Sequence, residues 1–197
     1  MQRYLHPGDY SIQIRNEIAT LLSEDKENII VMAENARVSY MKGEFARRYN
    51  VASIFRLMSE WDEERIYTPA TLADDSELVF RKAAGDGADA YKVYQPVAAT
   101  TAGQSPETHP AKWSKYSGHN PFVVLKLVDL ISYDLHSKYA RRAMPETVRE
   151  RYLEATTWVT RVGDGLIDAD LPALEVVTGE SSGDIRYNSH EAEDNRW

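Results

Sequence analysis

The chain has 197 residues, of which 43% are hydrophobic and 27% charged, a composition typical of a globular protein. It contains no cysteine, which excludes disulfides, thiolate metal sites and thiol catalysis. We find no run of 18 apolar residues and no basic-then-apolar leader, so neither a membrane span nor a signal peptide is expected. The formal charge of −8 argues against a general affinity for nucleic acid.

Two helices are predicted in the first fifty residues. Residues 10–22 carry a broad apolar stripe after the turn Pro7-Gly8-Asp9. Residues 26–49 repeat apolar and small side chains at spacings of three and four, from Ile29 to Gly43. A glycine inside a helix costs about 1 kcal/mol, so we interpret Gly43 as a point where another helix packs closely.

The stretch from residue 60 to residue 118 loses this periodicity and gains turn residues. Residues 78–80 and 91–94 are typical of strands, and the glycine-aspartate cluster at 84–89 indicates a turn between them. A structureless loop of this length is uncommon in a compact domain. We therefore predict a small β module inserted between helices.

Helical periodicity returns in residues 120–140 and 145–163. Asn120-Pro121 indicates the start of the first of these helices, which is apolar on most sides and is therefore predicted to lie at the centre of a bundle. The second carries a core-facing seam from Val148 to Leu166 and ends at Gly163 and Gly165. The following polar and mildly acidic residues lack a core signal.

These elements together predict a mainly α fold: an antiparallel bundle of about four helices with an inserted small β module and an extended C-terminal tail, α+β by content. We divide the chain into a helical core (residues 1–59 with 118–172), a β module (60–117) and a tail (173–197).

A search for catalytic chemistry identifies no site. The histidines at positions 6, 109, 119, 136 and 190 share no metal-ligand spacing. Asp129, Asp134 and His136 could in principle hold a metal in a bundle, but a satisfied polar network or plain solvent exposure is the favoured interpretation. No serine lies in a nucleophile elbow and no glycine loop matches a phosphate cradle. We predict a non-enzymatic protein with no cofactor and no metal.

The β module is rich in aromatic residues. They could form a sugar-stacking platform, or they could supply the core that so small a module needs, and we favour the core. The set comprises Trp61, Tyr91, Tyr94, Trp113 and Tyr116.

The helical segments resemble the Mu-like phage neck, or head–tail connector, family over roughly two thirds of the chain. No single motif is diagnostic; the order and spacing of the motifs carry the resemblance. The motifs are residues 10–18, 33–36, 45–51, 54–55, 120–121, 127–130, 133–136, 145–146, 151–152 and 163–165, with Ala155 and Trp158. The insert is a departure from the usual shorter chain, and its residues 94–106 with Trp113 resemble a chitin-binding type of three-stranded module.

The resemblance implies a subunit of a ring, commonly a dodecamer, that docks on the portal protein and extends the DNA channel towards the tail. Its partners would be the portal, neighbouring copies and the next neck or tail protein, with double-stranded DNA only as passing cargo and no membrane. Such a protein is made in the host bacterial cytoplasm and resides in the virion neck.

The resemblance also suggests contact residues. Residues of the tail would bind the portal or a neighbouring subunit: Ile185, Arg186, Tyr187, Asn195, Arg196 and Trp197. The β insert offers a possible contact surface at Trp61, Tyr94, Trp113 and Tyr116. Two alternatives remain open: a carbohydrate-binding or adhesion protein acting through the insert, and an enzyme with a metal in the bundle.

Overall fold

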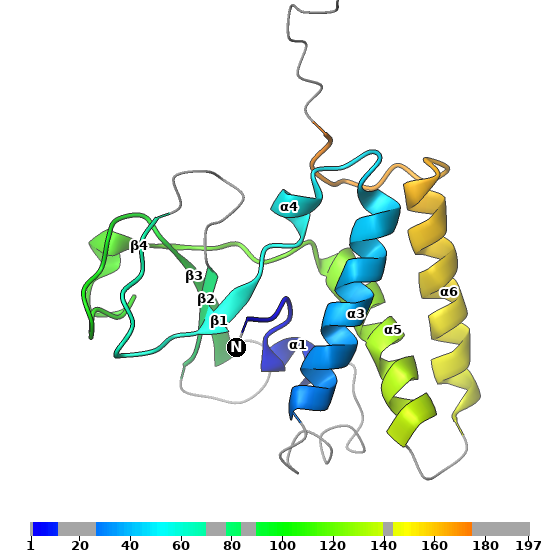
Figure 1. Ribbon diagram of the computed structural model, residues 1–197, viewed down its shortest axis with the longest axis horizontal. Helices are drawn as coiled ribbons and strands as arrows, with labels where there is room; N and C mark the ends of the chain where they lie inside the picture. Colours follow the sequence, from blue (N-terminus) through cyan, green and yellow to red (C-terminus); the bar gives the residue numbers. More distant parts are fainter. Residues whose placement is uncertain (1, 12–26, 70–77, 84–89, 140–143, 175–197) are drawn as a thin grey trace, which may run out of the picture.

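The protein combines a block of helices with a mixed β-sheet (Figure 1). The computed structural model describes residues 2–11, 27–69, 78–83, 90–139 and 144–174. Helices α3 (Glu27–Phe45), α5 (Pro121–Tyr139) and α6 (Glu146–Gly163) pack against one another, and the sheet lies beside them. The short helix α1 (Pro7–Ser11) lies between the sheet and the long helices (Figure 1).

The predicted mainly α, four-helix bundle is wrong, because the fold is a mixed α+β one. The bundle needed a helix over residues 10–22, of which only the part up to Ser11 is described, as the end of α1; residues 12–22 lie outside the described residues. The strands form a four-stranded sheet rather than the three-stranded module implied by the resemblance.

The three long helices agree with the predicted ones at 26–49, 120–140 and 145–163, although α3 ends four residues early. Asn120 caps α5, because its side-chain oxygen accepts hydrogen bonds from the backbone N–H groups of Phe122 (2.9 Å) and Val123 (3.2 Å). The short helix α4 (Val51–Ile54) follows α3 and is capped in the same way by Asn50, which accepts from the Ser53 N–H at 3.1 Å.

Helix α5 is the centre of the helical core, as its sequence predicts. It packs against both α3 and α6. Six of its apolar side chains are almost completely buried: Val123, Leu127, Val128, Leu130, Ile131 and Leu135. A stripe on α6 joins the same cluster through Ala155, Val159 and Val162, whereas Leu166, predicted to continue that stripe, lies beyond the helix end and is 69% exposed.

The close helix contact lies at a different glycine from the one the sequence indicated. A Cβ atom added at Gly43 would meet nothing within 4 Å, so the interpretation of Gly43 as a close-packing point is wrong. A Cβ atom at Gly163, by contrast, would lie 2.7 Å from the backbone oxygen of Glu44. The end of α6 therefore approaches the α3 backbone at Gly163.

The sheet has the strand order β1-β2-β3-β4. Its strands are β1 (Met58–Glu60), β2 (Leu78–Lys82), β3 (Tyr91–Pro96) and β4 (Trp113–Lys115). β1 pairs with β2 in parallel, and the other two pairs are antiparallel. Strands β2 and β3 confirm the predictions at 78–80 and 91–94; β1 and β4 were not predicted, and the turn predicted at 84–89 lies outside the described residues.

Both faces of the sheet bear apolar side chains, because successive residues of a strand point to opposite faces. One face gathers Met58, Leu78, Phe80 and Val93, with Tyr91 and Tyr116 packed against them. The other gathers Tyr67, Val79 and Trp113, with Trp61 and Tyr94. The pairing agrees with this division, since Phe80 lies opposite Val93 and Val79 opposite Tyr94.

The N-terminal segment joins the sheet to the helices. Arg3 exchanges two backbone hydrogen bonds with Met58 of β1, at 2.8 and 2.7 Å. Two residues later, Leu5 is fully buried in the helical core. The segment is therefore bonded to the sheet on one side and buried among the helices on the other. The division of the chain at residues 59 and 60 stays a prediction.

Candidate functional site

Glu34 of α3 anchors the N-terminal segment. Its side chain is fully buried, and its carboxylate accepts hydrogen bonds from the backbone N–H groups of Tyr4 and Leu5 (2.9 Å for Leu5) and from the hydroxyl of Tyr10 at 2.8 Å. Arg3 lies 3.8 Å from the same carboxylate. Burial raises the pKa of Glu34, while Arg3 and the hydrogen bonds oppose that rise.

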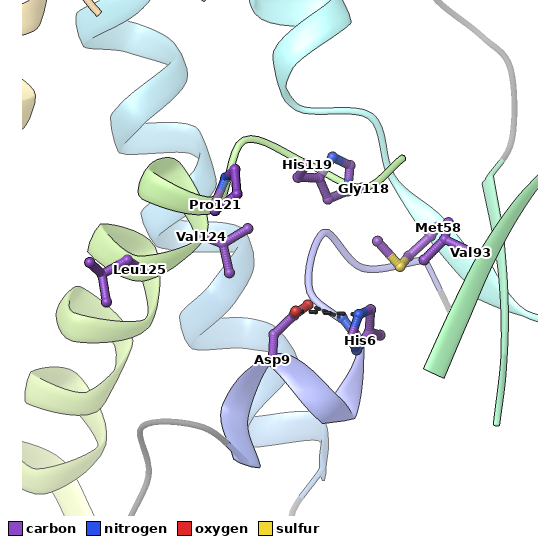
Figure 2. Close-up of a pocket in the computed structure, with 9 residues that line it drawn as sticks. All are labelled: His6, Asp9, Met58, Val93, Gly118, His119, Pro121, Val124 and Leu125. Carbon is purple, nitrogen blue, oxygen red and sulfur yellow. Dashed lines mark hydrogen bonds and ion pairs between the residues drawn. The ribbon is translucent and has the colours of Figure 1, made fainter. Parts of the chain in front are cut away.

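A cavity of about 230 Å³ lies between this segment, the sheet and α5. Figure 2 shows His6 and Asp9 on one side of it, Met58 and Val93 on the sheet side, and residues of α5 opposite. Asp9 belongs to α1, and its carboxylate accepts the backbone N–H of His6 at 2.9 Å. Two features account for the start of α1. Pro7 occupies the first helical position, and the side chain of Asp9 at the third position binds the backbone N–H of His6, the residue before the helix.

Burial shifts the pKa values of the titratable groups around the cavity. The His6 ring nitrogen Nε2 lies 3.3 Å from an Asp9 oxygen, yet burial and the nearby Arg3 lower the pKa of His6 to about 4. Burial raises the pKa of Asp9 to about 6. His119, stacked 4.0 Å from the Tyr4 ring, has its pKa lowered to about 3 by burial and by Arg56. Both imidazoles are therefore neutral at pH 7.

This cavity has imidazole and carboxylate side chains but no nucleophilic side chain beside them. The residues that line it contain no hydroxyl, thiol or amine side chain: His6, Asp9, Met58, Val93, Gly118, His119, Pro121, Val124 and Leu125. Within the described part of the chain, no group of three or more histidine and acidic side chains could hold a metal ion. The contacts between His6 and Asp9 stabilise the start of α1. The spacing of residues along the chain gave no signal for this cavity.

The three α5 side chains considered as metal ligands, those of Asp129, Asp134 and His136, do not form a metal-binding group. Asp134 forms two hydrogen bonds with Arg37 of α3, one of 2.6 Å from Nε. His136 contacts the Ser132 backbone oxygen, one turn earlier, at 2.9 Å. Asp129 is buried, which raises its pKa, and it faces Lys126 and Arg151. The Asp134 carboxylate belongs to an interhelical ion pair.

The aromatic residues predicted as a contact surface are divided between the two faces of the sheet. Trp113 is 6% exposed, packs edge-on against Tyr67 and lies in one face cluster with Tyr94 and Trp61. Tyr116 belongs to the opposite cluster, beneath the guanidinium of Arg56. Three of the four rings therefore share one face, where Trp113 is buried, and the fourth lies on the other face. The other predicted contact residues, from Ile185 to Trp197, lie outside the described residues.

An open apolar groove lies along the outer side of α6 and the turn after it. Its volume is about 370 Å³, and it is lined by Leu153, Glu154, Thr157, Trp158, Arg161 and Ile167. Leu153 is 54% exposed, and the neighbouring Leu166 and Phe122 are 69% and 46% exposed. Trp158 forms the floor, because its ring packs edge-on against Phe45 and Phe122. Sequence periodicity assigned Leu166 to the core and so missed this surface.

No family model, curated protein or solved structure matches the chain. None of the described helices is long and apolar enough to cross a membrane.

Proposed function

We propose that the protein is a structural subunit of a phage head–tail connector, assembling as a ring that docks on the portal and extends the DNA channel. The α6 groove carries the proposal. Exposed apolar side chains gathered on one helix surface are typical of protein–protein contacts, and here they lie on a close-packed helical block. The resemblance of the helical segments to the Mu-like neck family agrees with this role.

The charge of the chain suits a channel protein. The formal net charge of −8 gives a surface that repels phosphates, so DNA passes without binding tightly. The tail has the composition of a segment that orders on a partner: polar residues with the apolar anchors Ile185, Tyr187 and Trp197. Repetition around a ring would strengthen weak single contacts through avidity.

The carbohydrate-binding alternative is less well supported, because Tyr116 lies on the opposite face of the sheet from the other three candidate rings and, of those three, Trp113 is buried. A lectin site needs rings that face solvent together.

Deleting residues 184–197 tests the proposal. We expect the shortened subunit to keep its helical circular dichroism but to lose attachment to the portal protein encoded in the same genome, as measured by co-sedimentation and by electron microscopy of rings. A variant with residues 178–183 replaced by glycine and serine is the matched control and should still attach. If the shortened subunit saturates the portal normally, the tail does not make the connection.

A further inference from the structure

The cavity beside α1 is large enough for a small ring compound. Its volume is about 230 Å³, whereas an apolar cavity of about 150 Å³ already accommodates benzene. The buried side chains of Met58 and Val93 form the wall on the sheet side, and Val124 and Leu125 of α5 form the opposite wall (Figure 2). The cavity surface is therefore mainly apolar, with its polar atoms on a few side chains, as is usual for small-molecule sites.

Two imidazoles at this cavity are held in place by ring stacking. His119 stacks on Tyr4, with ring centroids 4.0 Å apart, and His6 stacks on Tyr91 at 5.3 Å. Both ring nitrogens of His119 and the Nδ1 atom of His6 are buried and have no hydrogen-bond partner within the described part of the chain. The Tyr4 backbone lies close enough to His119 to oppose the fall of its pKa, yet no hydrogen bond of normal geometry forms there. Because a buried polar atom without a partner costs free energy, a ligand that supplies the missing hydrogen bonds gains affinity.

The charges around the cavity favour a neutral ligand. The imidazoles of His6 and His119 are neutral at pH 7, because burial lowers both pKa values. The carboxylate of Asp9 repels an anion. A cation is disfavoured as well, because the positive charges of Arg3 and Arg56 act on the two imidazoles. The Asp9 carboxylate already accepts the His6 backbone N–H at 2.9 Å, so a charged ligand of either sign would lose its hydration without gaining an unpaired counter-charge.

We propose that this cavity binds a small neutral molecule of the phenol class, with one hydroxyl on an apolar ring. The ring lies between Val93 and Val124, and the hydroxyl forms hydrogen bonds with the imidazoles of His6 and His119. A neutral imidazole has one N–H donor and one acceptor nitrogen, and a hydroxyl both donates and accepts, so the two groups match. The site shares no lining residue with the α6 groove, and the inference goes beyond the connector role without depending on it.

Titration of the full-length protein with para-cresol tests the proposal, and toluene is the matched compound that lacks the hydroxyl. Methyl NMR spectra measure binding and locate it. We expect para-cresol to bind with a Kd of about 1 mM and to shift the methyl resonances of Val93 and Val124. Toluene should bind at least about tenfold more weakly, because it leaves the imidazole nitrogens without partners. Benzoate and benzylammonium should shift neither residue at the same concentrations.

Replacing each histidine by phenylalanine tests which groups bind the hydroxyl. His6→Phe and His119→Phe keep a ring on Tyr91 and on Tyr4 but remove the nitrogens. Each should weaken para-cresol binding by about threefold to tenfold and leave toluene binding unchanged. His109→Phe, at an exposed position outside the cavity, is the matched control and should change neither affinity.

Equal affinities for para-cresol and toluene would overturn the inference, because the cavity would then be only an apolar void. Shifts confined to residues outside the cavity would overturn it too, and so would the absence of any shift, which would indicate a cavity that holds only water. Val124→Phe fills the cavity and should abolish the shifts of Val93; unchanged binding by this variant, with its fold checked by circular dichroism, would contradict the site. None of these results bears on attachment to the portal, so the two proposals fail separately.

Discussion

Glu34 is buried and His119 has both of its ring nitrogens buried, and the N-terminal segment contacts both side chains. Glu34 receives hydrogen bonds from Tyr4, Leu5 and Tyr10, which are far from it in the sequence. His119 stacks on the ring of Tyr4. The environment of both side chains therefore depends on the packing of residues 3–10.

Replacing Glu34 by alanine should release the N-terminal segment. Two buried backbone N–H groups and the Tyr10 hydroxyl would lose their acceptor, which costs about 3 kcal/mol in the free energy of unfolding. Urea denaturation followed by circular dichroism measures this. Glu150→Ala, at an exposed position of α6, is the matched control and should change stability by less than about 0.5 kcal/mol. Equal effects of the two substitutions would contradict the anchoring role.

His119 should make the protein less stable in mild acid. Its pKa is about 3 in the folded protein and has the ordinary value of 6.5 in the unfolded chain, so below pH 6.5 only the unfolded chain takes up this proton. Above pH 6.5 the imidazole is neutral in both states and does not lower the free energy of unfolding. By pH 5.5 proton uptake by the unfolded chain has lowered that free energy by about 1.4 kcal/mol.

The variant His119→Phe isolates this effect, because a phenyl ring can keep the stack on Tyr4. His6 acts in the same sense, with its pKa lowered to about 4, and Asp9 in the opposite sense, with its pKa raised to about 6. The measurement is therefore the difference in unfolding free energy between the two proteins at pH 7.5 and 5.5. We expect the difference to move by about 1.4 kcal/mol in favour of the variant at the lower pH. A constant difference would contradict the burial of a neutral imidazole.

At the scale of elements, the contact between α3 and α6 depends on one glycine and not on another. Gly163→Ala would place a Cβ atom 2.7 Å from the Glu44 oxygen and should destabilise the protein by about 1–3 kcal/mol. Gly43→Ala, on an open side of α3, should instead stabilise it by up to about 1 kcal/mol. Thermal and urea unfolding of the two variants measure the opposite signs. Destabilisation by both would restore Gly43 as a packing position.

The elements that the sequence predicted correctly are those with strong local signals. Helices α3, α5 and α6 follow from apolar spacing, and α5 also from its Asn120-Pro121 start. Strands β1 and β4 were missed because three residues such as Met58-Ser59-Glu60 are too short to show alternation. They form strands only because β2 and β3 offer backbone partners.

At the scale of the whole molecule, the helical block and the sheet share the N-terminal segment. Arg3 pairs with β1 while Leu5 is buried among the helices, and a cavity lined by both parts lies beside them. The sequence carried no signal for this shared segment, because a local pattern does not show which distant strand it will meet.

The sequence by itself determined the long helices, two strands, the absence of thiol chemistry and the acidic charge, since each depends on composition or on neighbouring residues. Only the tertiary structure decided the mixed sheet, the Glu34 anchor, the ion pair of Arg37 with Asp134 and the exposure of Leu166 beside the α6 groove. Those features depend on contacts between residues far apart in the chain, and spacing along a sequence carries no information about such distances.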